Sequence, residues 1–262
     1  MIMKKTDCCQ AKKLCPFVML AMVSSLLLCS CSTFRMCSDE LKQAPQWGVP
    51  VLEPYTYVEL VHNKSEEGAV ATDSLTAVAR ELLTNVIVDN GQLSPTAVRT
   101  GEALPIGEVI RMDDADLYEQ IGRSLGSAVW ACKNGRQAKK IELPGELIDF
   151  MNANDYPYLM LVYHEGFVRT KGNYARDMAV DVAAKVLATA VGAALGGGGV
   201  YAYGAVPAKQ GSSMIVAVAD ASTGKLAYFN RQTGEDNDPL TRSTINNQLW
   251  RTLKRYPKPT GR

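Results

Sequence analysis

The chain has 262 residues, of which 47% are hydrophobic and 21% are charged, and its formal net charge at pH 7 is +1. A chain of this length can bury a sizeable core. Its near-neutral balance gives it no electrostatic reason to bind nucleic acid, so we expect no nucleic-acid partner.

Residues 1–30 have the layout of a bacterial secretory signal. Four lysines precede an apolar run from Phe17 to Leu28, and small residues follow that run. The run is shorter than the roughly 20 residues that a membrane-spanning helix needs, so an uncleaved transmembrane anchor is the weaker alternative. We therefore predict a cleaved signal peptide over residues 1–30.

The segment Leu28-Cys29-Ser30-Cys31 resembles a lipobox. By that resemblance the thiol of Cys31 is acylated, and Cys31 becomes the N-terminus of a mature protein held to the membrane by lipid. Cys29 is the competing cysteine, but it would place Leu28 at the cleavage position, where a small side chain is needed. No aspartate follows Cys31 directly, so nothing in the sequence indicates retention in an inner membrane. The predicted location is the outer membrane, in the periplasmic leaflet, with surface exposure left open.

Removal of residues 1–30 leaves 24 basic and 26 acidic side chains and three of the seven cysteines. With Cys31 acylated, Cys37 and Cys132 are the only possible disulfide pair, and the periplasm is oxidising. We favour two free thiols, because Cys37 lies in a predicted tether and the chain has no framework of paired cysteines.

Residues 31–55 read as a lipidated N-terminus and flexible tether, polar and broken by Pro45, Pro50 and Pro54, and the globular domain is predicted over 56–262. Its first strand is predicted at Thr56–His62. A helix over Ser74–Val88, capped by Thr72 or Asp73, is expected next, followed by a short strand at Glu108–Arg111.

Asp113 or Asp114 caps a predicted helix that runs to about Ala131, and Pro144 opens a short helix. Tyr156–Val168 is the strongest strand, and its two apolar faces are typical of a central strand covered on both sides. An alanine-rich helix is predicted over 173–195, ending in four glycines.

Residues 213–219 and 226–232 predict a hairpin, and residues 239–256 predict a closing helix. Strands that alternate with helices indicate an α/β layered domain with a mixed sheet flanked by helices on both faces.

Gly122-Arg123-Ser124-Leu125-Gly126 matches the G-x-S-x-G pattern of esterases, which works on a tight turn between a strand and a helix. Here it falls within a helical pattern, where the glycines would permit close packing against a neighbour. An envelope hydrolase that uses Ser124 with His62 or His164 is therefore the alternative function, and our prediction is that the chain is not an enzyme.

The chain has only two histidines and shows no metal-ligand spacing and no nucleotide-binding loop, so no cofactor and no metal are predicted. Residues 186–206 carry no charge, and Gly192 and Gly196 stand in a G-x-x-x-G relation. This segment is expected to pack on the sheet; the alternative is an oligomeric element that inserts into a membrane.

The strand at Tyr156–Val168, the hairpin Met214–Gln232 and the closing helix at Pro239–Tyr256 together resemble Gram-negative envelope lipoproteins with a domain of the TolB N-terminal or curli-secretion lipoprotein type. The alanine- and glycine-rich stretch at 176–206 departs from that pattern. The resemblance implies a lipid-anchored cell-envelope protein with an assembly, secretion or adaptor role. Its partners would be other envelope proteins, with self-association possible. Cys31 is the one residue with an expected chemical role, as the lipidation site.

Overall fold

Seven strands form one mixed sheet in the computed structural model, which describes residues 35–43, 45–61, 65–91, 100, 103–173, 175, 208–235 and 237–258. All of these residues belong to a unit that begins at Phe34. The strand order is β1-β7-β6-β5-β2-β4, and β3 also pairs with β5. The α/β fold with a mixed sheet is thus confirmed.

The centre of the sheet is β5 (Tyr158–Arg169), as its two apolar faces predict. It pairs antiparallel with β6 (Gln210–Asp220) over the whole range from Tyr158↔Asp220 to Val168↔Gln210. Its other edge is shared by two parallel strands, β2 (Val49–Leu52) and β3 (Tyr55–Val61). The sheet is completed by β4 (Ile106–Ile110), parallel to β2, and by β7 (Lys225–Glu235) and β1 (Arg35–Cys37), both antiparallel to their neighbours.

The predicted hairpin is formed by β6 and β7, and the turn between them follows from its sequence. Asp220 Oδ1 accepts hydrogen bonds from the backbone N–H of Ser222 at 2.9 Å and from that of Thr223 at 3.4 Å. Gly224 adopts a positive φ of 64°, which glycine tolerates without steric cost. The aspartate and the glycine therefore fix where the two strands reverse.

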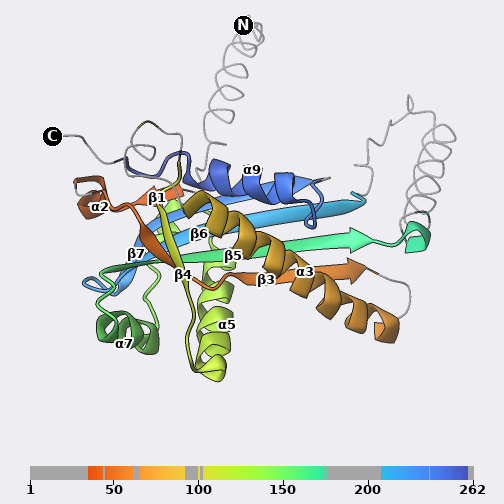
Figure 1. Ribbon diagram of the computed structural model, residues 1–262, viewed down its shortest axis with the longest axis horizontal. Coiled ribbons are helices and arrows are strands. Elements are labelled where there is room, and N and C mark those ends of the chain that lie inside the picture. The colour runs from red at the N-terminus through yellow and green to blue at the C-terminus, as the bar shows by residue number, and fades with distance from the viewer. Residues whose placement is uncertain are drawn as a thin grey trace, which may run out of the picture. The chain divides into compact units, whose positions relative to one another are not determined.

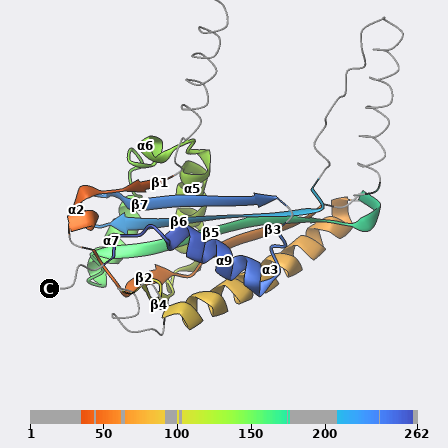
Figure 2. The ribbon, with the colours of Figure 1, turned by 90° about the horizontal axis from the view of Figure 1, so that it is seen from above.

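Helices cover both faces of the sheet, as predicted (Figure 2). On one face α5 (Ala115–Ala131) and α7 (Gly145–Ala153) bury a cluster around Leu125, Leu161 and Phe229, and the four-residue α6 (Gly135–Ala138) lies beside β1. On the other face α3 (Ser65–Gly91) and α9 (Arg242–Leu253) bury a second cluster around Leu83, Val216 and Leu249. Figure 1 shows α3 and α9 crossing the same side of the strands.

The predicted flexible tether over residues 31–55 is wrong for the described part of that range. Residues 35–37 form β1, Asp39–Gln43 form α2, and Val49–Leu52 form β2 within the sheet. Leu41, Val51 and Leu52 are fully buried. Short apolar stretches are enough to dock this segment, because β1 pairs with β7 and β2 pairs with both β4 and β5. The predicted signal peptide at 1–30 lies outside the described residues.

Helix α3 begins at Ser65, so Thr72 and Asp73 lie inside it and do not cap it. Thr72 Oγ1 accepts a hydrogen bond from Leu60 N, and Thr76 Oγ1 accepts one from Val58 N, both at 3.0 Å. These two N–H groups lie on the outer edge of β3, where no described strand pairs with them. The threonines thus protect an edge that would otherwise be open to pairing with another chain.

Candidate functional site

Ser124 lies in the middle of α5 and not on a turn after a strand. Its hydroxyl donates to the Ile121 carbonyl of its own helix at 3.2 Å. The flanking glycines face the sheet instead. A Cβ on Gly122 would lie 1.9 Å from Tyr55 Cε1, and one on Gly126 would lie 3.1 Å from Tyr163 Cε1. The glycines of the G-x-S-x-G pattern therefore bring the helix onto two tyrosine rings, which confirms the packing interpretation.

His164 is fully buried on the opposite face of β5, beside α9. Its Nε2 lies 2.9 Å from Ser212 Oγ, and that hydroxyl donates to Gln248 Oε1 at 2.9 Å. Because the Ser212 hydroxyl donates its hydrogen to Gln248, it accepts from His164, and Nε2 therefore carries the imidazole proton. Burial lowers the pKa of His164 to about 4, so the ring is neutral at physiological pH.

The pairing of Ser124 with His164 is therefore wrong. The sheet lies between the two side chains, and each is hydrogen-bonded to another group. His62, the other predicted partner of Ser124, lies outside the described residues.

Three tyrosine rings stack between α5 and the sheet. The Tyr55 ring lies between those of Tyr118, at 4.4 Å between centroids, and Tyr163, at 5.1 Å. The Tyr55 hydroxyl donates to the Tyr118 carbonyl at 2.8 Å, and the Tyr118 hydroxyl donates to the Glu53 carbonyl at 3.0 Å. Burial raises the pKa of all three phenols, so they remain protonated. The stack is a rigid aromatic wall.

A cavity of about 450 Å³ opens beside this wall, between α5 and the edge formed by β3 and β5. Its lining includes Tyr57, Arg80, Arg123 and Trp130. Two atoms of lining residues, Arg80 Nε and Tyr163 Oη, are buried and have no hydrogen-bond partner within the described residues. Buried polar atoms nearly always have a partner, so this lining is suited to a polar group placed between aromatic walls.

A second hollow, of about 650 Å³, adjoins the first and shares Tyr57 and Glu165 with it. It lies over the far part of β5, β6 and β7, and its floor includes Phe167, Ser213 and Thr233. None of the described helices covers this part of the face. Tyr57 lines both hollows, and the residue is 53% exposed.

The charges around the hollows are mixed. Partial burial raises the pKa of Glu165, and the positive charge of Arg231 opposes that rise. The Arg231 guanidinium lies 4.7 Å from the Trp130 ring centroid and donates to the Trp130 carbonyl at 3.3 Å. Aromatic rings and an arginine held against one of them are side chains that protein-binding surfaces favour. Ser212 and His164, which line the two hollows and are hydrogen-bonded to each other, are both buried, and the histidine is the donor in that bond.

Sequence reasoning missed these hollows, although two signals pointed to them. Tyr57 and Glu59 alternate along the predicted first strand, and Tyr55 just before it continues the same alternation, so all three share one face if the strand extends to Tyr55. Gly122 and Gly126 are four residues apart on one stripe of a helix, which marks a close approach to large side chains. Neither signal shows that the strand face with Tyr57 and the helix stripe with Gly122 lie against each other.

Cys31 and residues 186–206 lie outside the described residues. Within the described ranges, no helix has the length and apolar character needed to cross a bilayer. No group of three or more metal-ligating side chains occurs in that same part of the chain. Cys37 and Cys132 are both free, as favoured: Cys132 belongs to the α5 core cluster, whereas Cys37 packs against the cluster on the opposite face.

No protein-family model matches the chain, and no curated protein matches it. Among solved structures, a PelC dodecamer from Paraburkholderia phytofirmans is 10% identical, with a TM-score of 0.32 over 86% of this chain and 96% of that one. The LpoB C-terminal domain from Salmonella enterica is also 10% identical, with a TM-score of 0.24 over 83% and 95%. Likenesses of this size carry no argument about function.

Proposed function

We propose that this chain is a lipid-anchored cell-envelope protein that acts through contacts with other proteins and catalyses no reaction. Cys31 is the acylation site, and the outer membrane, in its periplasmic leaflet, is the location. The support for the anchor is the order of basic region, apolar run and lipobox-like segment before Cys31. Acylation of Cys31 by two or more chains would hold the protein stably, since two lipid signals together give stable anchoring.

The observation that carries the contact role is the pair of adjoining hollows around Tyr57 and Glu165. Protein-binding surfaces are enriched in tyrosine, tryptophan and arginine, and all three line the first hollow. Tyr57 is a large aromatic side chain exposed over half its surface. On this proposal Tyr57 is an anchor residue that becomes buried when a partner binds.

The contact role is tested by a photo-crosslinking amino acid at Tyr57 in intact cells. The matched control is the same amino acid at Val78, which is 48% exposed on α3, on the opposite face of the sheet. A discrete adduct is expected from position 57 and none from position 78, and mass spectrometry of the adduct identifies the partner. Equal adducts from both positions, or none from either, would overturn the contact role.

The anchor is tested separately with Cys31→Ser. The unchanged protein should incorporate labelled palmitate and fractionate with outer membranes, and the variant should lose the label. The matched control is Cys29→Ser, which removes the competing cysteine and should keep the label. Label that survives in Cys31→Ser would overturn acylation at this thiol.

A further inference from the structure

The first strand of the domain begins only four residues after Cys31. Arg35 opens β1 and pairs with Asn230 of β7. A fully extended chain advances at most about 3.6 Å per residue, so the Cα atoms of Cys31 and Arg35 lie within about 14 Å of each other. Each headgroup layer of a bilayer is roughly 5–8 Å thick. If Cys31 is acylated, as proposed above, the β1 edge of the sheet must lie at or just above the lipid headgroups.

The structure places a group of basic side chains at this edge. Helix α6 packs directly on β1, and a Cβ on Gly135 would lie 2.1 Å from the Arg35 carbonyl oxygen. Figure 2 shows α6 beside β1 at this edge of the sheet. The residues around α6 contribute four exposed basic side chains, which together with Arg35 form what we call the basic edge: Arg35, Lys133, Arg136, Lys139 and Lys140.

The charge of this edge is not cancelled locally. Residues 133–142 carry four basic side chains and one acidic side chain, Glu142. On the neighbouring segment, residues 35–43 carry two of each sign, and there Asp39 is held by Lys42 at 2.7 Å. The hydrogen bond and charge of Lys42 lower the pKa of Asp39, and the charge of Lys139 adds a smaller lowering. None of the four basic side chains around α6 forms an ion pair with a carboxylate of the described residues. A mature chain that is slightly acidic as a whole therefore presents a basic surface where its anchor enters.

We propose that the basic edge is the membrane-facing surface of the domain and binds the anionic phosphate groups of phospholipids in the leaflet that holds Cys31. A basic residue near an anionic surface raises membrane partitioning roughly fivefold. Four strand spacings separate β1 from β3, which corresponds to about 19 Å. With the basic edge on the lipid, Tyr57 lies on a strand four positions away from that edge.

The test uses the full lipidated protein in vesicles of phosphatidylcholine alone and in vesicles containing phosphatidylglycerol. A water-soluble amine-reactive reagent labels exposed lysines, and mass spectrometry gives the rate at each position. Lys133, Lys139 and Lys140 should react at least threefold more slowly on anionic vesicles. Lys171 and Lys209, which are also exposed and lie at the far end of β5 and β6, are the controls and should react equally on both.

High salt gives the second arm of the test. At 500 mM NaCl screening should remove the protection, because the interaction is electrostatic and reaches only a few ångströms there. Protection that is equal on both vesicle types, or that survives high salt, would overturn the proposal and point to contact with a second protein copy. These outcomes are separate from the anchor: a protein that fails to float with either kind of vesicle would contradict acylation of Cys31 instead.

Discussion

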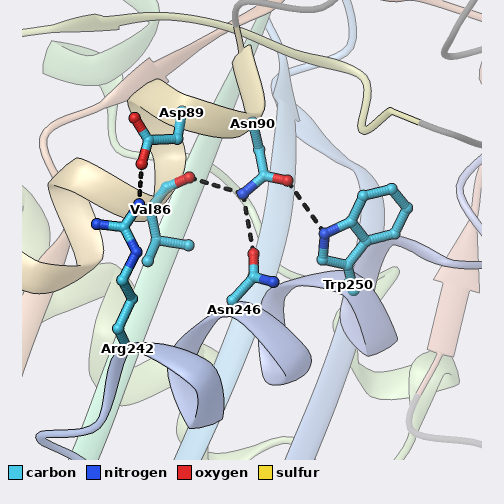
Figure 3. Close-up of polar contacts among 6 residues, drawn as sticks. All are labelled: Val86, Asp89, Asn90, Arg242, Asn246 and Trp250. Carbon is cyan, nitrogen blue, oxygen red and sulfur yellow. Dashed lines mark hydrogen bonds and ion pairs between the residues drawn. The ribbon is translucent and has the colours of Figure 1, made fainter.

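Trp250 on α9 donates its indole N–H to the side-chain oxygen of Asn90 on α3, at 3.0 Å (Figure 3). The amide nitrogen of Asn90 in turn donates to Asn246 Oδ1 at 3.0 Å and to the Val86 carbonyl at 2.8 Å. One half-buried side chain therefore joins two helices, through bonds to residues 156 and 160 positions further along the chain. Next to it, Asp89 and Arg242 form an ion pair between the same two helices.

Asn90→Ala should lower the free energy of unfolding by about 1–3 kcal/mol, since it leaves Trp250 and Asn246 without their partner. The neighbouring change Asp89→Asn is the control. It weakens an ion pair whose two side chains are more than half exposed, and such pairs contribute about 0–1 kcal/mol. Urea unfolding of both variants measures the difference. Equal losses would show that the Asn90 contacts contribute no more than the exposed pair.

Gly122→Ala should destabilise the protein by about 1–3 kcal/mol, because the new methyl group would overlap the Tyr55 ring. That ring cannot move aside easily, as it is stacked between Tyr118 and Tyr163.

Gly126→Ala is the control on the same helix. Its Cβ would meet Tyr163 at 3.1 Å, and the gain of about 1 kcal/mol in helix propensity offsets that milder contact. Thermal unfolding should leave Gly126→Ala near the unchanged protein and Gly122→Ala well below it. A Gly122→Ala protein of unchanged stability would contradict the close approach of α5 to the tyrosine stack.

Changing Thr72 and Thr76 to valine should open the edge of β3. The backbone N–H groups of Leu60 and Val58 would lose their acceptors, while the volume of each side chain stays nearly the same. Hydrogen exchange at these two amides should become faster by an order of magnitude or more, as a lost bond of about 1–2 kcal/mol implies. Thr84→Val on the same helix is the control and should leave both amides protected. Unchanged exchange in the double variant would show that other groups protect this edge.

Because of His164, the protein should be less stable in mild acid than at neutral pH. Its pKa is about 4 in the folded state against an ordinary value of 6.5, so the unfolded chain binds more protons between those two pH values. The free energy of unfolding therefore falls as the pH drops from 6.5 to 4, by up to about 3 kcal/mol from this group.

The comparison that isolates this effect is His164→Gln, which keeps a side chain able to hydrogen-bond Ser212 and cannot titrate. The difference in unfolding free energy between the two proteins should shrink steadily from pH 7 to pH 4. Carboxylates such as Glu165 contribute equally to both proteins and cancel in the difference. A difference that does not vary with pH would mean that His164 is protonated as readily when folded as when unfolded.

The thiols of Cys37 and Cys132 should stay reduced in the native protein. They pack against clusters on opposite faces of the sheet, so no disulfide can join them without unfolding. Burial raises the pKa of both thiols, which slows their reaction with alkylating reagents. Mass spectrometry after alkylation in denaturant without reductant should find both modified, and Cys37, which is only half-buried, should react first in the native protein. A bridged peptide would contradict the sheet topology.

The sequence alone predicted the elements that rest on local signals. Asp114, one of the two predicted caps, caps α5, the continuous apolar run marks β5, and Asp220 with Gly224 marks the hairpin turn, because each of these depends on neighbouring residues. The fold class followed from their order along the chain. The glycines around Ser124 were also recognised as packing positions, since no strand precedes them.

The tertiary structure decided what depends on residues far apart in sequence. Only the sheet shows that residues 35–43 and 45–54 are docked, because β1 and β2 are too short to be stable without the edges of β7 and β5. Only the packing of α5 beside β3 and β5 forms the first hollow, and only the pairing of β5, β6 and β7 brings together the floor of the second. Only the contact of α6 with β1 gathers the basic edge. Burial and charge at these places depend on side chains from segments that are far apart in sequence, so a local sequence pattern does not predict them.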